Sequence, residues 1–245
     1  MGKYRPVTRL IREKKKGEGK AEVPSKKRFK QILWMASGGN LGKRNVAIIW
    51  MLFGSGMRIN EVAKLKIKDL LRDTNELRTT FIIPAAYTKT DKSRAAYILA
   101  KPHIRAVEEW ISEMVYQRVC VIENDEFRGL NPDWPLFAVT KKGNSWRTMA
   151  FRDKKYTDVE GNVLTTRVCS SLQTLVSEIF RNSGLLCGTH AGRRALATWL
   201  DQKGVELDTI QRILGHNDPE MTLEYIDPNF ERISEAFNKS FRNIN

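Results

Sequence analysis

Apolar residues recur at helical spacing along most of the chain after residue 28. Phe29, Ile32 and Leu33 begin the pattern, and a longer apolar run follows at 46–52. Positions three and four apart share one face of a helix, so this spacing predicts amphipathic helices. The glycines at 54 and 56 end the second of these helices, which puts Arg58 at a helix entrance. Further helical spacing is found at 59–71, 103–118, 166–182, 191–202 and 205–214.

Two other segments have the character of strands. Residues 77–84 and 95–99 are rich in β-branched and apolar residues, and the polar segment 88–94 separates them, which predicts a hairpin with a basic tip. Residues 124–161 hold several Pro, Gly and Asn turn pairs and predict loops with at most short strands. The expected fold class is therefore mainly α with a small antiparallel β-sheet or hairpin (α+β).

The first 28 residues differ from the rest because they are crowded with basic side chains and have little to bury. They predict a flexible arm over residues 1–28 that contacts phosphates, or else a solvated tail without a role. Globular structure is expected from Phe29. The basic residues of the arm expected to bind DNA are Lys14, Lys15, Lys16, Lys26, Lys27 and Arg28.

Composition narrows the possible partners. The 245 residues carry a formal net charge of +14, which favours a polyanion such as nucleic acid. The three cysteines have no CxxC spacing, so neither a disulfide framework nor a zinc site is indicated, and a reducing, cytoplasmic setting is expected. No apolar run approaches the roughly 20 residues that span a bilayer, and the N-terminus lacks the apolar part of a signal peptide, so no membrane partner is expected.

Candidate chemistry is concentrated near the C-terminus. His190 and Arg193 lie in the run GTHAGR, His216 follows in LGH, and Tyr225 comes nine positions later; two of the three histidines of the chain fall in this segment. Arg58 adds a second arginine upstream. Attack on a phosphodiester adds negative charge to its oxygens, and planar, permanently charged guanidinium groups bind such oxygens in pairs. The set therefore predicts a site at which a tyrosine attacks a phosphodiester.

These residues, with a lysine on the hairpin tip, resemble the tyrosine recombinase (phage integrase) family, whose site has the order Arg, Lys, His-x-x-Arg, His or Trp, Tyr. The resemblance implies that Arg58, Arg193 and His216 bind the phosphate and that His190 helps to accept a proton. It makes Tyr225 the nucleophile. Lys89 best matches the lysine that protonates the leaving 5′ oxygen, with Lys92 as the alternative.

Three further charged residues accompany the set. Glu61 matches an acidic position of the family and is expected to orient a catalytic cation, although an ordinary helix-face carboxylate has the same appearance. Lys92 and Arg94 lie on the hairpin loop and are expected to contact DNA. Arg194 departs from the family, because many relatives have a second histidine there.

The resemblance covers about residues 29–245 and implies a catalytic domain over 29–228. Apolar residues at 230, 233, 237 and 241 predict a C-terminal helix over 229–245, packed either on its own domain or on a neighbouring subunit. The chain is then either a stand-alone catalytic domain or part of a longer integrase.

The function implied is that of a site-specific DNA recombinase of the integrase, excisionase or invertase type. Such an enzyme works through a 3′-phosphotyrosine and a Holliday junction, as a homo-tetramer on double-stranded DNA. It needs no cofactor and no metal, and accessory DNA-bending or directionality proteins are possible partners. Two alternatives remain at this point: a type IB topoisomerase acting as a monomer, and a DNA-binding regulator that has lost activity.

Overall fold

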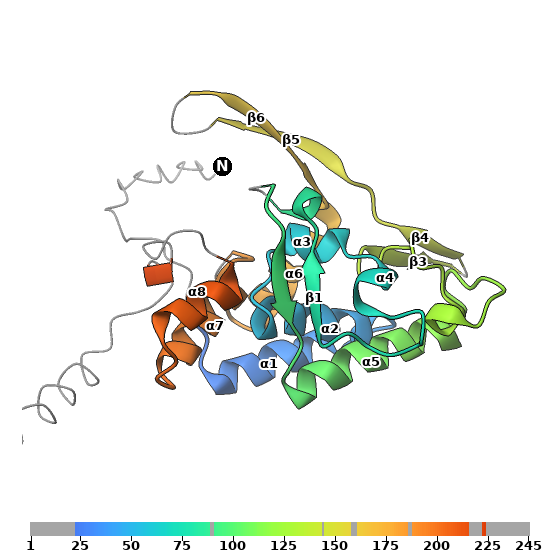
Figure 1. Ribbon diagram of the computed structural model, residues 1–245, viewed down its shortest axis with the longest axis horizontal. Helices are drawn as coiled ribbons and strands as arrows, with labels where there is room; N and C mark the ends of the chain where they lie inside the picture. The colour runs from blue at the N-terminus through green and yellow to red at the C-terminus, as the bar shows by residue number, and fades with distance from the viewer. Residues whose placement is uncertain are drawn as a thin grey trace, which may run out of the picture.

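The computed structural model describes residues 23–88, 91–143, 145–157, 161–185, 188–215 and 222–223. Figure 1 shows a body of packed helices with β-hairpins on its surface, one of which extends well beyond the body. The helices are α1 (Lys26–Ala36), α2 (Gly42–Gly54), α3 (Ile59–Lys64), α4 (Ile67–Leu70), α5 (Lys101–Tyr116), α6 (Ser170–Asn182), α7 (Ala191–Asp201) and α8 (Leu207–Leu214), with short 3-10 turns η1 (Ala85–Tyr87) and η2 (Glu126–Gly129).

Six described strands form three separate antiparallel hairpins. Each hairpin joins strands that are neighbours in the sequence. The expected fold class, mainly helical with small antiparallel sheets, is confirmed. The pairs are β1 (Thr80–Ile83) with β2 (Arg94–Tyr97), β3 (Val139–Lys142) with β4 (Ser145–Thr148), and β5 (Arg152–Thr157) with β6 (Val163–Val168).

Helix α2 forms the centre of the core. Its sequence is apolar on nearly every face, and Ile48, Met51 and Leu52 are completely buried. A helix of this kind must be covered on several sides. It packs against α1, α5 and α7 accordingly.

The first helix begins earlier than the sequence pattern indicates. The Ser25 hydroxyl caps α1 by accepting a hydrogen bond from the Arg28 amide at 3.2 Å, so the helix starts at Lys26 rather than at Phe29. The Arg28 guanidinium donates to the Ser183 carbonyl oxygen at 2.6 Å, and the Lys26 ammonium lies 3.5 Å above the centre of the Trp199 ring. Residues 26–28 of the expected arm therefore belong to the folded body.

The break after α2 is confirmed. Gly56 has a φ of +59°, and a side chain there would also meet Leu214, because a Cβ would lie 2.8 Å from its Cδ2 atom. One continuous helix over residues 59–71 was the wrong expectation. The chain is extended at Leu65 and Lys66, where it pairs with the segment around Pro135, and α4 begins afterwards.

The hairpin of β1 and β2 was expected, but the strands after residue 138 were not fully anticipated. Segment 124–161 holds β3, β4 and β5, and the end of β6 occupies residues 166–168, which the pattern had assigned to a helix. Both faces of β5 carry polar residues, with the sequence RDKKYT, so the apolar alternation that normally identifies a strand is missing.

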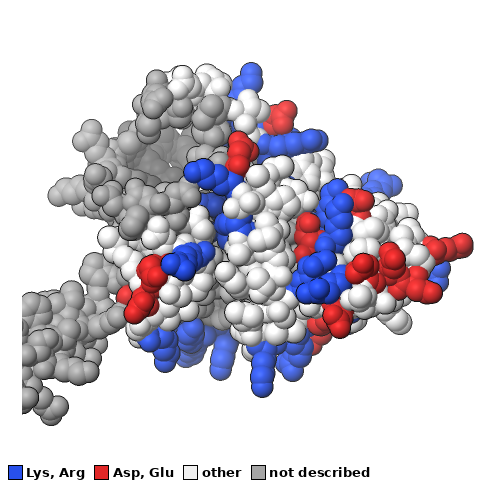
Figure 2. Space-filling view, in the orientation of Figure 1, with Lys and Arg blue, Asp and Glu red and all other residues white. Residues whose placement is uncertain are grey.

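The surface is unevenly charged. Figure 2 shows Lys and Arg side chains along the lower edge of the molecule, over α1 and α5. Exposed basic residues on these two helices include Lys27, Lys30, Lys101 and Arg105.

Among the helices that the structure describes, none is both long and apolar enough to cross a membrane.

Candidate active site

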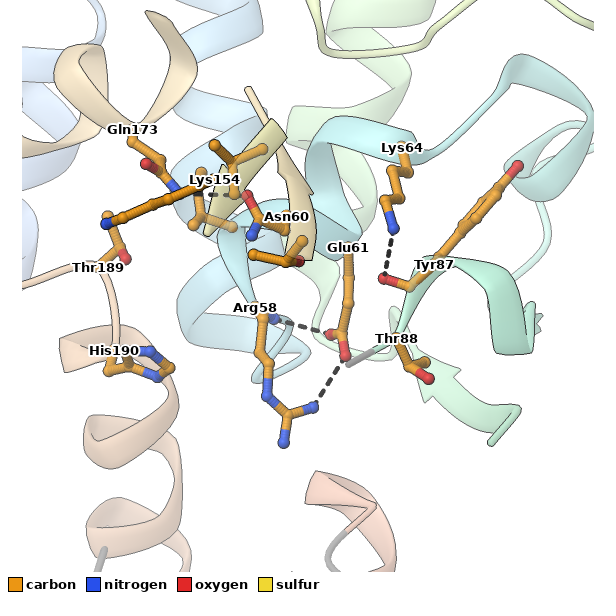
Figure 3. A pocket seen from close by; sticks show the side chains of 13 residues that line it. Arg58, Asn60, Glu61, Lys64, Tyr87, Thr88, Lys154, Gln173, Thr189 and His190 are labelled. Carbon is orange, nitrogen blue, oxygen red and sulfur yellow. Dashed lines mark hydrogen bonds and ion pairs between the residues drawn. The ribbon is translucent and has the colours of Figure 1, made fainter. Parts of the chain in front are cut away.

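A pocket of about 640 Å³ opens between the start of α3, the base of the β5–β6 hairpin, α6 and the segment before α7. Figure 3 shows side chains from all of these elements around it. Arg58 and His190, which the sequence assigned to one site, both line this pocket. The remaining residues around it are Ile59, Asn60, Glu61, Lys64, Tyr87, Thr88, Lys154, Thr166, Val168, Gln173 and Thr189.

Arg58 is held by the helix that it begins. It is the N-cap of α3, and its backbone amide donates to Glu61 Oε2 at 2.8 Å. Its guanidinium Nη1 forms an ion pair with Glu61 Oε1 at 2.9 Å, as the dashed lines in Figure 3 mark. A carboxylate in the first turn of a helix also interacts favourably with the helix dipole. Glu61 therefore fixes both the backbone and the side chain of Arg58.

Glu61 pairs with a second arginine that the sequence had placed on the DNA-binding surface. Arg94 Nη2 lies 2.7 Å from Glu61 Oε2, and the Arg94 side chain is only 9% exposed. It is turned into the protein rather than outward. Burial raises the pKa of the Glu61 carboxyl, but Arg94 and then Arg58 outweigh it, so the pKa is lowered overall. We call Arg58, Glu61 and Arg94 the charge cluster.

The charge cluster extends to the end of α8. Gly215 ends this helix in the left-handed conformation, with φ +62°, and packs so closely on the Arg94 side chain that a Cβ has no room. Arg94 thus contacts both Glu61 and the turn that precedes His216.

Arg193 lies on α7 and is 1% exposed. Its Nη1 donates to the Gly56 carbonyl oxygen at 2.7 Å, and its Nη2 donates to the Leu214 carbonyl oxygen. Gly192 makes this position possible, because a Cβ there would lie 2.7 Å from the Leu52 carbonyl oxygen of α2. The second arginine of the motif therefore connects the turn before Arg58 with the end of α8.

His190 is the N-cap of α7, and it is exposed at the pocket. Lys92 is exposed on the loop between β1 and β2, where its backbone amide donates to the Thr88 hydroxyl at 3.2 Å. Several other predicted positions lie outside the described residues. They are Lys89, His216, Tyr225, the basic residues Lys14, Lys15 and Lys16, and the C-terminal segment 229–245.

Two pocket lysines were not anticipated from the sequence. Lys64 Nζ donates to the Ala86 carbonyl oxygen at 2.9 Å, and burial lowers the pKa of its ammonium group. Lys154 reaches the pocket from β5. No motif marks either lysine, and Lys154 falls in segment 124–161, which was expected to hold loops with at most short strands. The described residues contain no group of His, Cys, Asp and Glu side chains placed to hold a metal ion.

The amino-acid sequence is similar to known recombination proteins. Tyrosine recombinase XerC of Lactobacillus leichmannii is 24% identical over 206 residues, a match that covers 83% of this chain and 57% of the relative. Transposase A from transposon Tn554 of Staphylococcus aureus is 22% identical over 242 residues, covering 97% of this chain and 56% of the relative. The chain thus spans somewhat more than half the length of these relatives.

The fold has solved counterparts. The crystal structure of XerH site-specific recombinase bound to palindromic difH substrate, a post-cleavage complex, matches with a TM-score of 0.56 and 23% identity, over 88% of this chain and 51% of that one. Residues 23–232 match the phage integrase family. This match includes Arg58, the His190–Arg193 motif and Tyr225, and the chain belongs to the phage integrase family.

Proposed function

We propose that this protein is a site-specific DNA recombinase that cuts and rejoins strands through a 3′-phosphotyrosine. One observation carries the proposal. Arg58 and His190 come from distant parts of the sequence but line one pocket, and Glu61 holds Arg58 there through two contacts. A fixed arginine beside an exposed histidine is suited to the charge and the proton of a phosphodiester reaction.

We assign stabilisation of the negative charge that develops on the phosphate oxygens to Arg58 and Arg193, with His216 as a further donor. Because the pKa of Glu61 is lowered, its carboxylate stays ionised and keeps Arg58 oriented at neutral pH. Arg193 adds positive charge behind the turn that carries Arg58, through its bond to the Gly56 carbonyl. Orientation before the reaction is what makes such charges effective.

In the proposed step the phenolic oxygen of Tyr225 forms a bond to phosphorus while the bond from phosphorus to the 5′ oxygen breaks. His190 assists removal of the phenolic proton. The 5′ oxygen takes a proton from Lys89, or from Lys92, and leaves as a hydroxyl. The reverse step, with a 5′ hydroxyl as the attacking group, rejoins a strand.

The relatives support the choice of substrate. Their names include a tyrosine recombinase and a transposase, and XerH was solved with its DNA substrate after cleavage. We accordingly propose double-stranded DNA at specific sites as the substrate, a mobile element as the setting, and a homo-tetramer on DNA as the active form. The C-terminal segment 229–245 is proposed to pass between subunits, and residues 1–22 to contact DNA phosphates.

The test is covalent capture. Wild-type protein is incubated with a nicked duplex from the end of its own element, and products are separated on a denaturing gel with and without EDTA. We expect a protein–DNA adduct in both conditions, and none with Tyr225→Phe, which removes only the phenolic oxygen. Tyr87→Phe is the matched control, because Tyr87 lines the pocket without an assigned role in the reaction.

The outcomes distinguish the proposed recombinase from a nuclease, a topoisomerase and a DNA-binding regulator. An adduct that persists in Tyr225→Phe would falsify the assignment of the nucleophile. Cleavage that stops in EDTA and returns with magnesium identifies a nuclease. An adduct without strand exchange between two duplexes identifies a topoisomerase, and DNA binding without any adduct identifies a regulator.

A further inference from the structure

The β5–β6 hairpin brings a cation to the pocket that the family motif does not include. Lys154 of β5 lies directly opposite Thr166 of β6, and both residues line the pocket together with Arg58 and His190. In the view of Figure 3 the Lys154 side chain extends toward Thr189. The base of the hairpin is anchored, because Val168 is buried and Arg152 Nε donates to the Ser170 hydroxyl at 2.6 Å.

The two faces of the hairpin differ. Successive side chains of a strand point to opposite faces, so Lys154 and Lys155 lie on different sides of β5. Lys155 is exposed and is not among the pocket residues, although it has the same charge and an adjacent place in the chain. The hairpin therefore turns one of these two lysines toward the pocket.

The pocket has more positive than negative charge. Its lining contains three cations, Arg58, Lys64 and Lys154, and one carboxylate, that of Glu61. Glu61 is already engaged by Arg58 and Arg94, and the Lys64 ammonium donates to a backbone carbonyl. Within the described part of the chain Lys154 has no carboxylate partner, so its charge is available to an anion from outside.

The polar groups around Lys154 fit a phosphodiester backbone. Thr166 and Thr189 supply hydroxyls, and Gln173 Nε2 donates to Asn60 Oδ1 at 3.1 Å on the same wall. The volume of about 640 Å³ is many times the roughly 10–15 Å³ that holds one water molecule on the same measure, so the pocket is not limited to a single small group. The pocket thus has room for a phosphate on Arg58 and for another beside it.

We propose that Lys154 binds a DNA phosphate next to the scissile one, and that the β5–β6 hairpin positions the cut strand in this way. The proposal rests on the function proposed above in taking DNA as the ligand. It adds a strand-positioning residue delivered by the hairpin, outside the set of residues that carry out the chemistry.

The first experiment measures binding without requiring cleavage or a known site. Wild type, Lys154→Ala and Lys155→Ala are titrated with a random-sequence duplex of about 20 base pairs over a range of salt concentrations. The slope of log K against log salt is negative, and each lost phosphate contact reduces its magnitude by about 0.9. We expect that loss for Lys154→Ala and an unchanged slope for Lys155→Ala. Both side chains are exposed, and matching melting temperatures will verify that both variants fold.

The second experiment locates the phosphate on the duplex that wild type cleaves. Phosphates near the cut are replaced one at a time by methylphosphonates, which lack the charge, and single-turnover cleavage is measured. On unmodified DNA we expect Lys154→Ala to cleave about tenfold more slowly, which corresponds to one broken charge contact. At one position next to the scissile phosphate, the methylphosphonate should slow wild type by a similar factor and leave Lys154→Ala unaffected.

Two results overturn the proposal: equal salt slopes for Lys154→Ala and wild type, or additive effects of Lys154→Ala and the methylphosphonate at every position. Failure of the proposed function has a different signature. Wild type then forms no covalent adduct on any duplex, while the salt slopes still decide whether Lys154 binds a phosphate.

Discussion

The charge cluster and the β5–β6 hairpin both contribute cations to the same pocket. The cations of the cluster are held by a buried carboxylate, whereas the cation of the hairpin is exposed. In the cluster, Glu61 is fully buried and two arginines are bonded to its carboxylate. In the hairpin, residues 152–155 are all exposed, and among the described strands β5 and β6 pair only with each other. The cluster supplies charge whose orientation is fixed in advance, which suits the reacting phosphate. The hairpin supplies charge on an exposed, projecting element, which suits the proposed contact with a neighbouring phosphate.

The largest effect is expected from breaking the charge cluster. Glu61→Gln keeps the shape of the side chain but removes the charge that both arginines share. Removing one partner of a buried ion pair costs about 3–5 kcal/mol, or roughly 10 °C in melting temperature for a chain of this size. Asp153→Asn, the same type of change on the hairpin, should alter stability by less than about 0.5 kcal/mol. Thermal unfolding measures both.

The same variant has a defined pH dependence. The pKa of Glu61 is lowered from 4.5 in the folded protein, so the carboxylate stabilises the fold fully above that value and loses its contribution as the pH falls through the lowered pKa. The difference in melting temperature between wild type and Glu61→Gln should stay constant from pH 7 to about 5 and narrow below 4.5. A difference that widens in acid contradicts the ion-pair assignment.

A smaller loss is expected from separating α7 and α2. In Gly192→Ala the new Cβ meets the backbone of Leu52, which cannot move as a flexible side chain can. Overpacking of this kind costs about 1–3 kcal/mol, and it displaces Arg193 on the same turn. Gly188→Ala is the control from the same segment, because a Cβ there has nothing within 4 Å. Equal urea midpoints for the two variants would show that α7 and α2 can accommodate the additional methyl group without loss of stability.

The smallest effect on stability is expected from shortening the hairpin. Replacing residues 155–165 with Asn-Gly keeps the pairs Arg152 with Val168 and Lys154 with Thr166, and closes them with a tight turn. Because residues 155, 157, 161–163 and 165 of this stretch are all exposed, the melting temperature should change by less than about 2 °C. A fall of the size expected for Glu61→Gln would mean that the hairpin is structural, and the contrast between the two regions would disappear.

Sequence patterns correctly predicted those elements of the site that depend on residues close together in the sequence. The glycine break before Arg58, the hairpin of β1 and β2, and the helix that begins at His190 all follow from short-range signals, and the structure has each of them. The basic tip of that hairpin was expected to face DNA. Lys92 is exposed there, and its contact with DNA stays a prediction.

What the sequence could not provide is the direction in which charged side chains point. Lys92 lies on the loop and Arg94 begins β2 two residues later, yet Arg94 turns inward because a carboxylate from α3 lies within 2.7 Å. That carboxylate is distant in sequence, and no periodicity reports it. Lys154 was missed for a related reason: a strand with polar residues on both faces has no apolar alternation to identify it.

The two carbonyls that Arg193 binds also determine when the site can form. They belong to Gly56 and Leu214, so the site is closed only after α8 has been synthesised and has docked. Contacts between such distant segments form slowly compared with local ones. A growing chain that has not yet reached residue 214 already contains Arg58, but not the carbonyl that joins Arg193 to α8. Such a chain therefore holds Arg193 through the Gly56 carbonyl alone of these two contacts.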